Sequence, residues 1–381
     1  MNVAFGFREY DLHEYAKQFR QIWLGEHLDS LTIQKLASRA FDAVQKYAYG
    51  KRGKPRFKSY GQLDSVEGKT NASGIRYRAG IIEWLGLELH CRIDPKDKVQ
   101  QHGLQHRVKY VRLVRRKIHG QNRFYAQLVC EGKPYQKTKN KVKQGVIGLD
   151  IGPSTIAGVG DHDVFLKEFC TELADRAAEI RHLQRKLDRQ RRANNPENYE
   201  ADGTIKAGQK TWKYSKNYLE TRAKLAELHR QLAAHRKSLH GKLVNDILRM
   251  GDDIHLEKLS YRAFQKRYGR SVARRAPGMF VSMLKRKAAS ASARVTELPT
   301  HQLKLSQTCH HCGKQVKKLL SQRWHECECG IVAQRDLYAA FLAVCVERGR
   351  LNMDLAKQAW SPTGCPADKC GCALSGGVES Y

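Results

Sequence analysis

The spacing of apolar residues changes several times along the chain, and each change predicts a different kind of element. Residues 30–47 (SLTIQKLASRAFDAVQKY) carry an apolar side chain every three or four positions, which predicts an amphipathic helix, and residues 9–28 are expected to be helical too. From 75 to 131 the spacing falls to two, so strands are expected in GIIEWLGLELHCRI, VKYVRLVRRKI and RFYAQLVCEG, with a hairpin turn at HGQN. This pattern predicts a small antiparallel β domain or barrel. Its exposed faces are expected to carry basic side chains that suit contact with a nucleic-acid backbone: Arg112, Arg115, Arg116 and Lys117.

A second group of elements follows a basic, polar linker at 133–144. The run GVIGLDIGPSTIAGVGD at 145–161 is apolar on both sides of a single acid, Asp150, and predicts a buried hairpin. Two long basic helices are expected at 172–192 and 214–249, joined by a polar loop. This helical hairpin is either a plain coiled-coil spacer or a grip on nucleic acid.

Three acids stand out because of the elements that carry them. Asp150 lies in an expected central strand, Glu257 near the end of a short strand in DDIHLEKLS, and Asp336 in the first turn of the helix AQRDLYAAFLAVCV. A buried carboxylate without a partner is costly, so Asp150 needs either a basic partner or a metal ion shared with other carboxylates. Two strands and a helix that bring acids together form the site that a two-metal nuclease requires. Each acid also has an ordinary alternative, because Asp336 can cap its helix and Glu257 can pair with Lys258 or an arginine.

The charge of the chain narrows the class of partner. The 381 residues include 69 Lys and Arg against 38 Asp and Glu, a formal net charge of +31. An excess of this size, in a chain with 41% hydrophobic residues, indicates a folded protein that binds nucleic acid. The segment KRGKPRFK is either a solvated linker or a loop that clamps a phosphate backbone through five basic side chains: Lys51, Arg52, Lys54, Arg56 and Lys58.

Cysteine spacing indicates a metal site. The sequence has no stretch of 18 or more apolar residues, and its start lacks the layout of a signal peptide, so a cytoplasmic, nucleoid-associated protein is expected. The eleven cysteines are then thiols or metal ligands. In QTCHHCGKQVKKLLSQRWHECECG, four of them have the spacing of a ribbon-type site for one structural Zn²⁺: Cys309, Cys312, Cys327 and Cys329.

Other potential metal ligands lie within this module and in the C-terminal tail. The second cysteine pair is tighter than usual, and three histidines are near enough to replace a ligand: His310, His311 and His325. Cys365, Cys370 and Cys372 lie in a tail rich in Gly, Ser and Pro, which is expected to be disordered, with a second metal site as the alternative.

Taken in order, these motifs resemble a known family. The sequence GLDIG, then HLEKLS, then the four-cysteine module and QRDLYAAFLA resemble the RuvC-type nuclease domain of TnpB. TnpB proteins are RNA-guided DNA endonucleases of insertion sequences, related to the compact type V CRISPR effectors. The upstream GKPRFKS resembles the segment that follows the short helical lobe of the family. The likeness covers most of residues 30 to 345 and is most specific from 145 onward.

The resemblance implies a fold and an activity. The fold is α/β with further β and α parts: an RNase H-like (RuvC) nuclease domain with an inserted zinc ribbon, an N-terminal β-barrel-like wedge domain and a short helical recognition lobe. Asp150, Glu257 and Asp336 would hold two catalytic Mg²⁺ ions, and the ribbon would help load target DNA. A guide RNA from the element's end would select double-stranded target DNA beside a short motif. A monomer without membrane contact is favoured.

The implied domain layout divides the chain into seven segments. They are the recognition lobe and basic loop (1–58), the wedge (59–135), a linker (136–144), the nuclease domain with its helical hairpin (145–304), the ribbon (305–332), the last nuclease helix (333–360) and the tail (361–381).

The chain departs from the family at two points. Tyr338 stands where members often carry Asn, which puts a contact behind the metal ligands in doubt. NVAFGFREY is the only candidate for a first strand, so the wedge is expected to be incomplete or the start misplaced.

Three other functions compete with the guided nuclease. The first is a nuclease-inactive RNA-guided repressor: Tyr338, which departs from the family pattern, favours it, whereas the presence of all three acids argues against it. A DNA transposase lacks support, because neither an HUH-type site nor a serine-recombinase patch is visible. A non-specific basic zinc-ribbon nucleic-acid-binding protein leaves GVIGLDIG unexplained.

Overall fold

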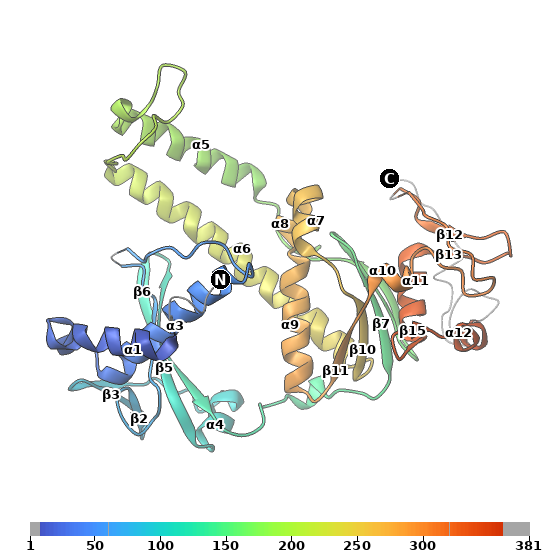
Figure 1. Cartoon of the computed structure of the whole chain (residues 1–381), viewed down its shortest axis with the longest axis horizontal. Coiled ribbons are helices and arrows are strands. Elements are labelled where there is room, and N and C mark those ends of the chain that lie inside the picture. The colour runs from blue at the N-terminus through green and yellow to red at the C-terminus, as the bar shows by residue number, and fades with distance from the viewer. Residues whose placement is uncertain (1–7, 60, 320, 361–381) are drawn as a thin grey trace. The chain divides into compact units, whose positions relative to one another are not determined.

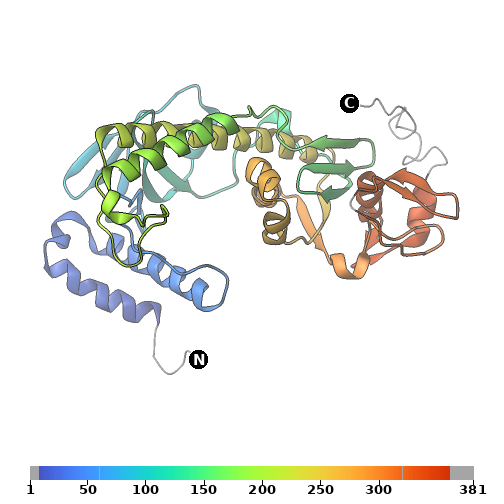
Figure 2. The same cartoon turned by 90° about the horizontal axis from the view of Figure 1, so that it is seen from above.

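The chain divides into two compact units, residues 1–135 and 136–381 (Figures 1 and 2). The computed structural model describes residues 8–59, 61–319 and 321–360. The tail with Cys365, Cys370 and Cys372, and most of NVAFGFREY, lie outside these ranges. No helix within them is long and apolar enough to cross a membrane.

The first unit combines short helices with two small sheets. Its elements are α1 (Glu9–Gln18), η1 (Phe19–Gln21), α2 (Leu24–His27), α3 (Ser30–Ala48), β1 (Ser65–Glu67), β2 (Arg76–Arg78), β3 (Ile81–Trp84), β4 (Leu87–His90), α4 (Lys98–Leu104), β5 (Val108–Ile118) and β6 (Gln121–Cys130). The helix predicted at 30–47 is therefore confirmed, and the helical segment at 9–28 is broken into three pieces.

The β strands expected in the first unit are present, but the barrel-like closure is wrong. The strands form two three-stranded sheets, β1-β5-β6 and β2-β3-β4, and within the described residues no strand pairing joins one sheet to the other. The sheets share a small core of Ile75, Ile82 and Val111. Alternation specifies which side chains face inward, whereas closure depends on strand tilt and stagger, which the alternation does not contain. The predicted hairpin turn is confirmed at His119 and Gly120, whose φ angles of 48° and 78° allow a tight two-residue turn between β5 and β6.

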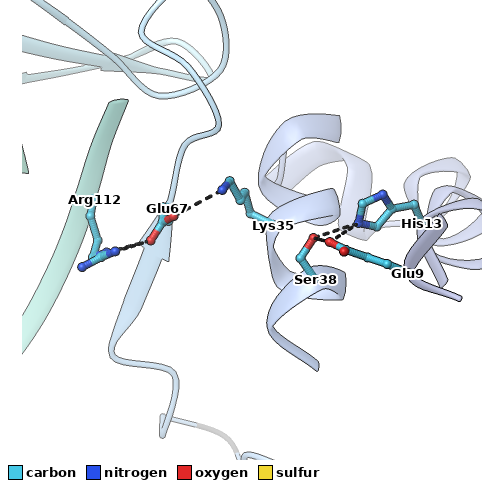
Figure 3. Close-up of polar contacts among 6 residues, drawn as sticks. All are labelled: Glu9, His13, Lys35, Ser38, Glu67 and Arg112. Carbon is cyan, nitrogen blue, oxygen red and sulfur yellow. Dashed lines mark hydrogen bonds and ion pairs between the residues drawn. The ribbon is translucent and has the colours of Figure 1, made fainter. Parts of the chain in front are cut away.

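Polar contacts connect the helices of the first unit to its strands. The Asp29 carboxylate caps α3 by accepting from the backbone N–H groups of Leu31 and Thr32, and also accepts from the Thr32 hydroxyl and from the indole N–H of Trp84 on β3. On α3 itself, the Ser38 hydroxyl meets Glu9 and His13 of α1 (Figure 3). These bonds fix α3 against α1 and against β3.

Two arginines expected to face nucleic acid are paired with acids instead. Arg112 of β5 donates to Glu67 of β1, which also lies 3.5 Å from Lys35 of α3 (Figure 3). Arg115 pairs with Asp64. These two arginines are therefore part of the joint between α3, β1 and β5, and less available to phosphate groups.

The second unit is built on a five-stranded sheet. Its elements are η2 (Thr138–Asn140), β7 (Val146–Ile151), β8 (Thr155–Val159), β9 (Val164–Glu168), α5 (Ala177–Asn194), η3 (Pro196–Asn198), α6 (Lys216–Leu248), β10 (Asp253–Glu257), α7 (Tyr261–Arg267), α8 (Gly269–Arg275), α9 (Pro277–Ser290), β11 (Arg294–Leu298), α10 (Thr300–Leu303), β12 (Trp324–Glu326), β13 (Val332–Gln334), α11 (Arg335–Val344), β14 (Val346–Glu347), β15 (Arg350–Leu351) and α12 (Met353–Ala359).

The central sheet has the strand order β11-β10-β7-β8-β9. β7, β8 and β9 are antiparallel, as expected for a hairpin around Asp150, whereas β10 runs parallel to both β7 and β11. One face of the sheet packs on α6 and α9, and the other face packs on α11 (Figure 1). Ile147, Leu149 and Ile151 all belong to the α6–α9 core, so the alternate residues of β7 point toward α11.

The two long basic helices are confirmed as α5 and α6, which lie side by side (Figure 2). The loop between them is ordered by two asparagines: the side-chain amides of Asn195 and Asn198 donate to the carbonyl oxygens of Lys213 and Thr211. The C-terminal half of α6 contributes Val244, Ile247 and Leu248 to the core between the sheet and α9, so this half of the helix is packed on the central sheet.

Candidate functional site

Asp150 lies at the centre of the sheet, on the face that α11 covers. Asp150 and Gly148 are two positions apart in β7 and therefore face the same side of the sheet. On that side α11 approaches Gly148 closely: a Cβ atom on Gly148 would lie 1.9 Å from the carbonyl oxygen of Ala340 and 2.9 Å from the amide nitrogen of Val344. Only a glycine fits between strand and helix at this point. The close approach of α11 brings its first turn to the end of β7 that carries Asp150.

Glu257 ends the neighbouring strand on the same face. In β10, which lies parallel to β7, Leu256 pairs with Leu149, so Glu257 follows at the level of Asp150. Two residues earlier, the buried His255 bonds through Nδ1 to the carbonyl oxygen of Ala343 on α11, which shows that this set of side chains faces the helix. Burial raises the pKa of Glu257 above its ordinary value.

Asp336 is the second residue of α11. The side chain of Gln334 caps the helix by accepting from the N–H of Leu337, so Asp336 does not perform the capping that the sequence left open. Its carboxylate instead contacts two guanidinium groups. Arg335 Nε and Nη2 each lie 3.2 Å from Oδ1, and Arg323 Nη1 lies 3.9 Å from Oδ2.

The three carboxylates act on one another electrostatically. The pKa of Asp150 is raised well above its ordinary value, first by desolvation and then by the negative charges of Asp336 and Glu257, while the positive charge of Arg335 opposes the shift. Three acids from two strands and a helix therefore share one partly buried region, in which the guanidinium of Arg335 acts on both Asp336 and Asp150. Such a region favours a divalent cation, because oxygen donors of this kind are the preferred ligands of Mg²⁺.

The spacing of the acids differs from that of the cysteines. Among the described residues, the sulfur atoms of the four cysteines all lie within 4.8 Å of one another. The oxygen atoms of the three carboxylates do not form such a compact group. The carboxylates have the donor chemistry and the common face that a Mg²⁺ site needs, but binding of cations must bring their oxygens closer.

The four cysteines form a compact cluster that can bind zinc. Sγ of Cys309 lies 3.5 Å from that of Cys329, and Sγ of Cys312 lies 3.5 Å from that of Cys327. A tetrahedral site with Zn–S bonds of about 2.3 Å separates its sulfurs by just under 4 Å, so the cluster fits the ion. The backbone N–H of Cys329 is the main cause that lowers the pKa of Cys327 to about 7, whereas burial raises the pKa of Cys309 and of Cys329.

Two of the three histidines near the cluster, His310 and His325, contact Tyr338 of α11. The backbone N–H of His310 donates to the Tyr338 hydroxyl, and the ring Nδ1 lies 2.7 Å from the same oxygen. The His325 ring packs against the Tyr338 ring at a tilt of 35°, with 4.2 Å between centroids. Burial lowers the pKa of His310 to about 4, so its ring is neutral at physiological pH. Tyr338, the departure noted in the sequence, therefore joins the cysteine module to α11.

Two residues that sequence reasoning missed lie beside the carboxylates. The Tyr261 hydroxyl is buried and, among the described residues, has no hydrogen-bond partner. Burial, with the charges of Glu297 and Asp150, raises its pKa far above the ordinary value, so it remains an O–H donor. Arg335 was visible only as the neighbour of Asp336. No periodicity or spacing distinguishes either residue, because their importance comes from which segments the fold places next to them.

The five basic residues proposed to meet phosphates lie on an exposed segment. Lys51, Arg52, Lys54, Arg56 and Lys58 are all exposed, in a stretch without helix or strand after α3. Lys51 lies over the ring of Tyr49, 5.9 Å from its centroid. The segment belongs to the first unit and the carboxylates belong to the second.

Comparison with known proteins links these elements to a family. Residues 278–342, which include the four cysteines and Asp336, match the model of the Cas12f1-like TNB domain. Similar solved structures include the cryo-EM structure of the Cas12f1–sgRNA–target DNA complex, at 13% identity over 88% of this chain and 75% of that chain with a TM-score of 0.47. Another is the cryo-EM structure of a CRISPR–Cas12f ternary complex, at 13% identity over 91% and 76% with a TM-score of 0.33. No curated protein sequence matches the chain. Residues 278–342 are therefore similar to a Cas12f1-like TNB domain, and over this segment the match confirms the expected resemblance to the compact type V effectors.

Proposed function

We propose that this chain is an RNA-guided DNA endonuclease that cuts target DNA at one RuvC-like site formed by Asp150, Glu257 and Asp336. One observation supports the proposal most directly: three acids from β7, β10 and α11 lie on one partly buried face of the sheet, and residues 278–342, which hold the four cysteines and Asp336, match a Cas12f1-like TNB domain. A basic nucleic-acid-binding protein without catalysis has no reason to bury mutually repelling carboxylates.

The chemistry requires divalent metal. Asp150, Glu257 and Asp336 would hold two Mg²⁺ ions, and ions held in this way would supply a metal-activated water molecule and stabilisation of both the attacking and the leaving oxygen of a phosphodiester. Asp150 and Glu257 are fixed by neighbouring strands, and Asp336 is set by the close packing of α11 on Gly148. Burial of Asp150 strengthens its interaction with a cation, and the protonated Tyr261 provides a hydrogen-bond donor in the same region.

The partners follow from charge and from the family. A net charge of +31 supports a large phosphate contact surface, which a guide RNA and double-stranded target DNA would provide. Base pairing with the guide would supply most of the sequence specificity, and the protein would read a short motif beside the target. The guide would come from the end of a transposable element, and one structural Zn²⁺ would hold the cysteine module.

A nuclease-inactive repressor is less well supported. Tyr338 was the residue that favoured it. That side chain contacts His310 and His325, so it has a structural role, and all three acids are still present. Loss of cleavage would leave the burial of Asp150 without a reason.

The RNA partner is tested by purification of the protein expressed together with its native flanking DNA. Sequencing of the bound RNA should give one discrete species that ends in sequence from the edge of the transposable element. Heterogeneous RNA, or none, would contradict RNA guidance and leave a non-specific RuvC-like nuclease or a basic binder.

A further inference from the structure

Arg335 connects the cysteine module to the carboxylate of Asp336. Its Nη1 donates to the carbonyl oxygens of Leu319 and Gln322, at 3.1 and 2.7 Å, in the segment between the two cysteine pairs. The other edge of the guanidinium, Nε and Nη2, faces Oδ1 of Asp336 at 3.2 Å. The side chains of Arg335 and Asp336 are each only 13% exposed. One rigid, planar group is therefore held at both edges.

The two oxygens of Asp336 are treated differently. Both short contacts from Arg335 go to Oδ1. Among the described residues, Oδ2 has only the distant contact at 3.9 Å from Arg323, whose side chain is 61% exposed. An arginine that paired through both oxygens would occupy the carboxylate completely, as bidentate pairs do. The observed contact orients the carboxylate and leaves one oxygen for another ligand.

The backbone strengthens this connection. The Arg335 N–H donates to the carbonyl oxygen of Arg323, and β13 runs directly into α11. The segment that holds the guanidinium is itself fixed, because the N–H of Leu319 donates to Oε1 of Gln322 at 2.7 Å. The position of the guanidinium is therefore set by the folded cysteine module rather than by α11 alone.

We propose that Arg335 is a positioning residue through which the four-cysteine module orients Asp336, so that Oδ1 is held by the guanidinium and Oδ2 is presented to a divalent cation. This inference rests on the proposed function, because it concerns how the same carboxylates bind metal. It implies that zinc at the four cysteines and a divalent cation at the carboxylates are coupled, although the two sites share no ligand. Such a coupling between distinct sites needs a physical connection, which Arg335 supplies.

The test measures Mn²⁺ binding to the full-length protein by the loss of the free-ion EPR signal, without any cleavage assay. The carboxylate site is defined as the Mn²⁺ binding that Asp150→Ala abolishes. Arg335→Gln should weaken that binding about tenfold or more, since second contacts of this kind typically change metal affinity by about 10- to 100-fold. Arg335→Lys should also weaken it, because an ammonium group cannot reach both the carbonyl oxygens and Oδ1 as a planar fork does.

A matched control removes a positive charge from the same module. Lys314 pairs with Glu328 at 2.8 Å on the exposed surface, so Lys314→Gln changes the net charge by the same amount without touching Asp336. Its Mn²⁺ affinity should equal that of the wild type. Zinc content by elemental analysis identifies any variant whose module has unfolded.

The coupling has a second readout that does not depend on a variant folding. Extraction of zinc from the wild-type protein, followed by dialysis to remove the chelator, should weaken Mn²⁺ binding at the carboxylate site. The same extraction should change the affinity of Arg335→Gln little, because the connection is already cut.

Each outcome decides a different claim. Tighter Mn²⁺ binding by Arg335→Gln would make the guanidinium a competitor of the metal, and unchanged binding would make it irrelevant; either overturns the inference and leaves the proposed function standing. Wild-type affinity in Arg335→Lys would show that charge alone matters and would also overturn it. If Asp150→Ala and the wild type bind Mn²⁺ equally, the carboxylate site itself fails, and the proposed function fails with it.

Discussion

The packing of α11 on β7 leads to a sharp prediction about Gly148. Gly148→Ala places a methyl group where the carbonyl oxygen of Ala340 would lie 1.9 Å away and the amide nitrogen of Val344 2.9 Å away. Contacts under 3.0 Å are essentially never seen for a real Cβ atom, and both neighbours are backbone atoms that cannot rotate aside. The helix or the strand must therefore move by about 1 Å.

The loss of folding stability follows from that displacement. Overpacking of this kind costs about 1–3 kcal/mol, and the rigid backbone neighbours place Gly148→Ala at the upper end, about 3 kcal/mol. Asp336 lies in the first turn of the displaced helix, whereas Asp150 and Glu257 stay on the sheet. A misplacement of about 1 Å among catalytic groups can lower the rate about 100-fold, so cleavage should suffer more than stability alone explains.

Two measurements test this reasoning together. Hydrogen exchange of peptides from 335–344 reports the local stability of α11, and a single-turnover cleavage rate reports the alignment of the acids. Gly160→Ala is the matched control at the end of β8, because its Cβ would meet nothing closer than 3.4 Å. Normal protection of α11 and a cleavage rate within twofold of the wild type in Gly148→Ala would refute the close-packing argument.

Three further predictions concern other parts of the chain. Asp29→Ala should destabilise α3 by about 2 kcal/mol at pH 7, because the cap is lost. Burial alone would raise the pKa of Asp29, but its four hydrogen bonds lower that pKa below 3.8. The stability that Asp29 adds should therefore be complete above about pH 5 and be lost as the pH falls through the pKa of the folded state, which hydrogen exchange of α3 can follow. Cys309→Ser should abolish stoichiometric zinc in elemental analysis and reduce protection of α11, and full zinc occupancy would contradict the four-thiolate site. Tyr261→Phe should lower the cleavage rate by about 100-fold or more without weakening nucleic-acid affinity, because it removes one buried O–H donor. An unchanged rate would show that the hydroxyl does not act in the reaction.

Local pattern was sufficient for the elements and for the order of the acids. Apolar spacing located α3, β5, β6 and the two long helices, because a side chain's face is set by the period of its own element. The hairpin around Asp150 followed from an apolar run interrupted by a single acid. Cysteine spacing located the metal cluster for a similar reason, since knuckles are formed by short local segments.

Features that depend on distant segments were not predictable from the pattern. Arg112 and Arg115 were expected to be free for phosphates, yet their partners Glu67 and Asp64 lie 45 and 51 residues away along the chain. The barrel failed for the same reason, because closure depends on how two sheets meet. Arg335 belongs to this class too: its role arises from carbonyl oxygens 13 and 16 residues upstream.

The most direct measurement of the central claim is cleavage of a plasmid that carries a target complementary to the bound RNA. The wild-type complex should cut the matched plasmid in Mg²⁺ and leave a plasmid with a scrambled target intact. Asp150→Ala and Glu257→Ala should bind the matched target as the wild type does, because binding comes from the basic surface, and should not cut it. A control at the exposed acid Asp163, Asp163→Ala, should cut normally. Cutting by Asp150→Ala at the wild-type rate, or equal cutting of both plasmids by the wild type, would contradict the account.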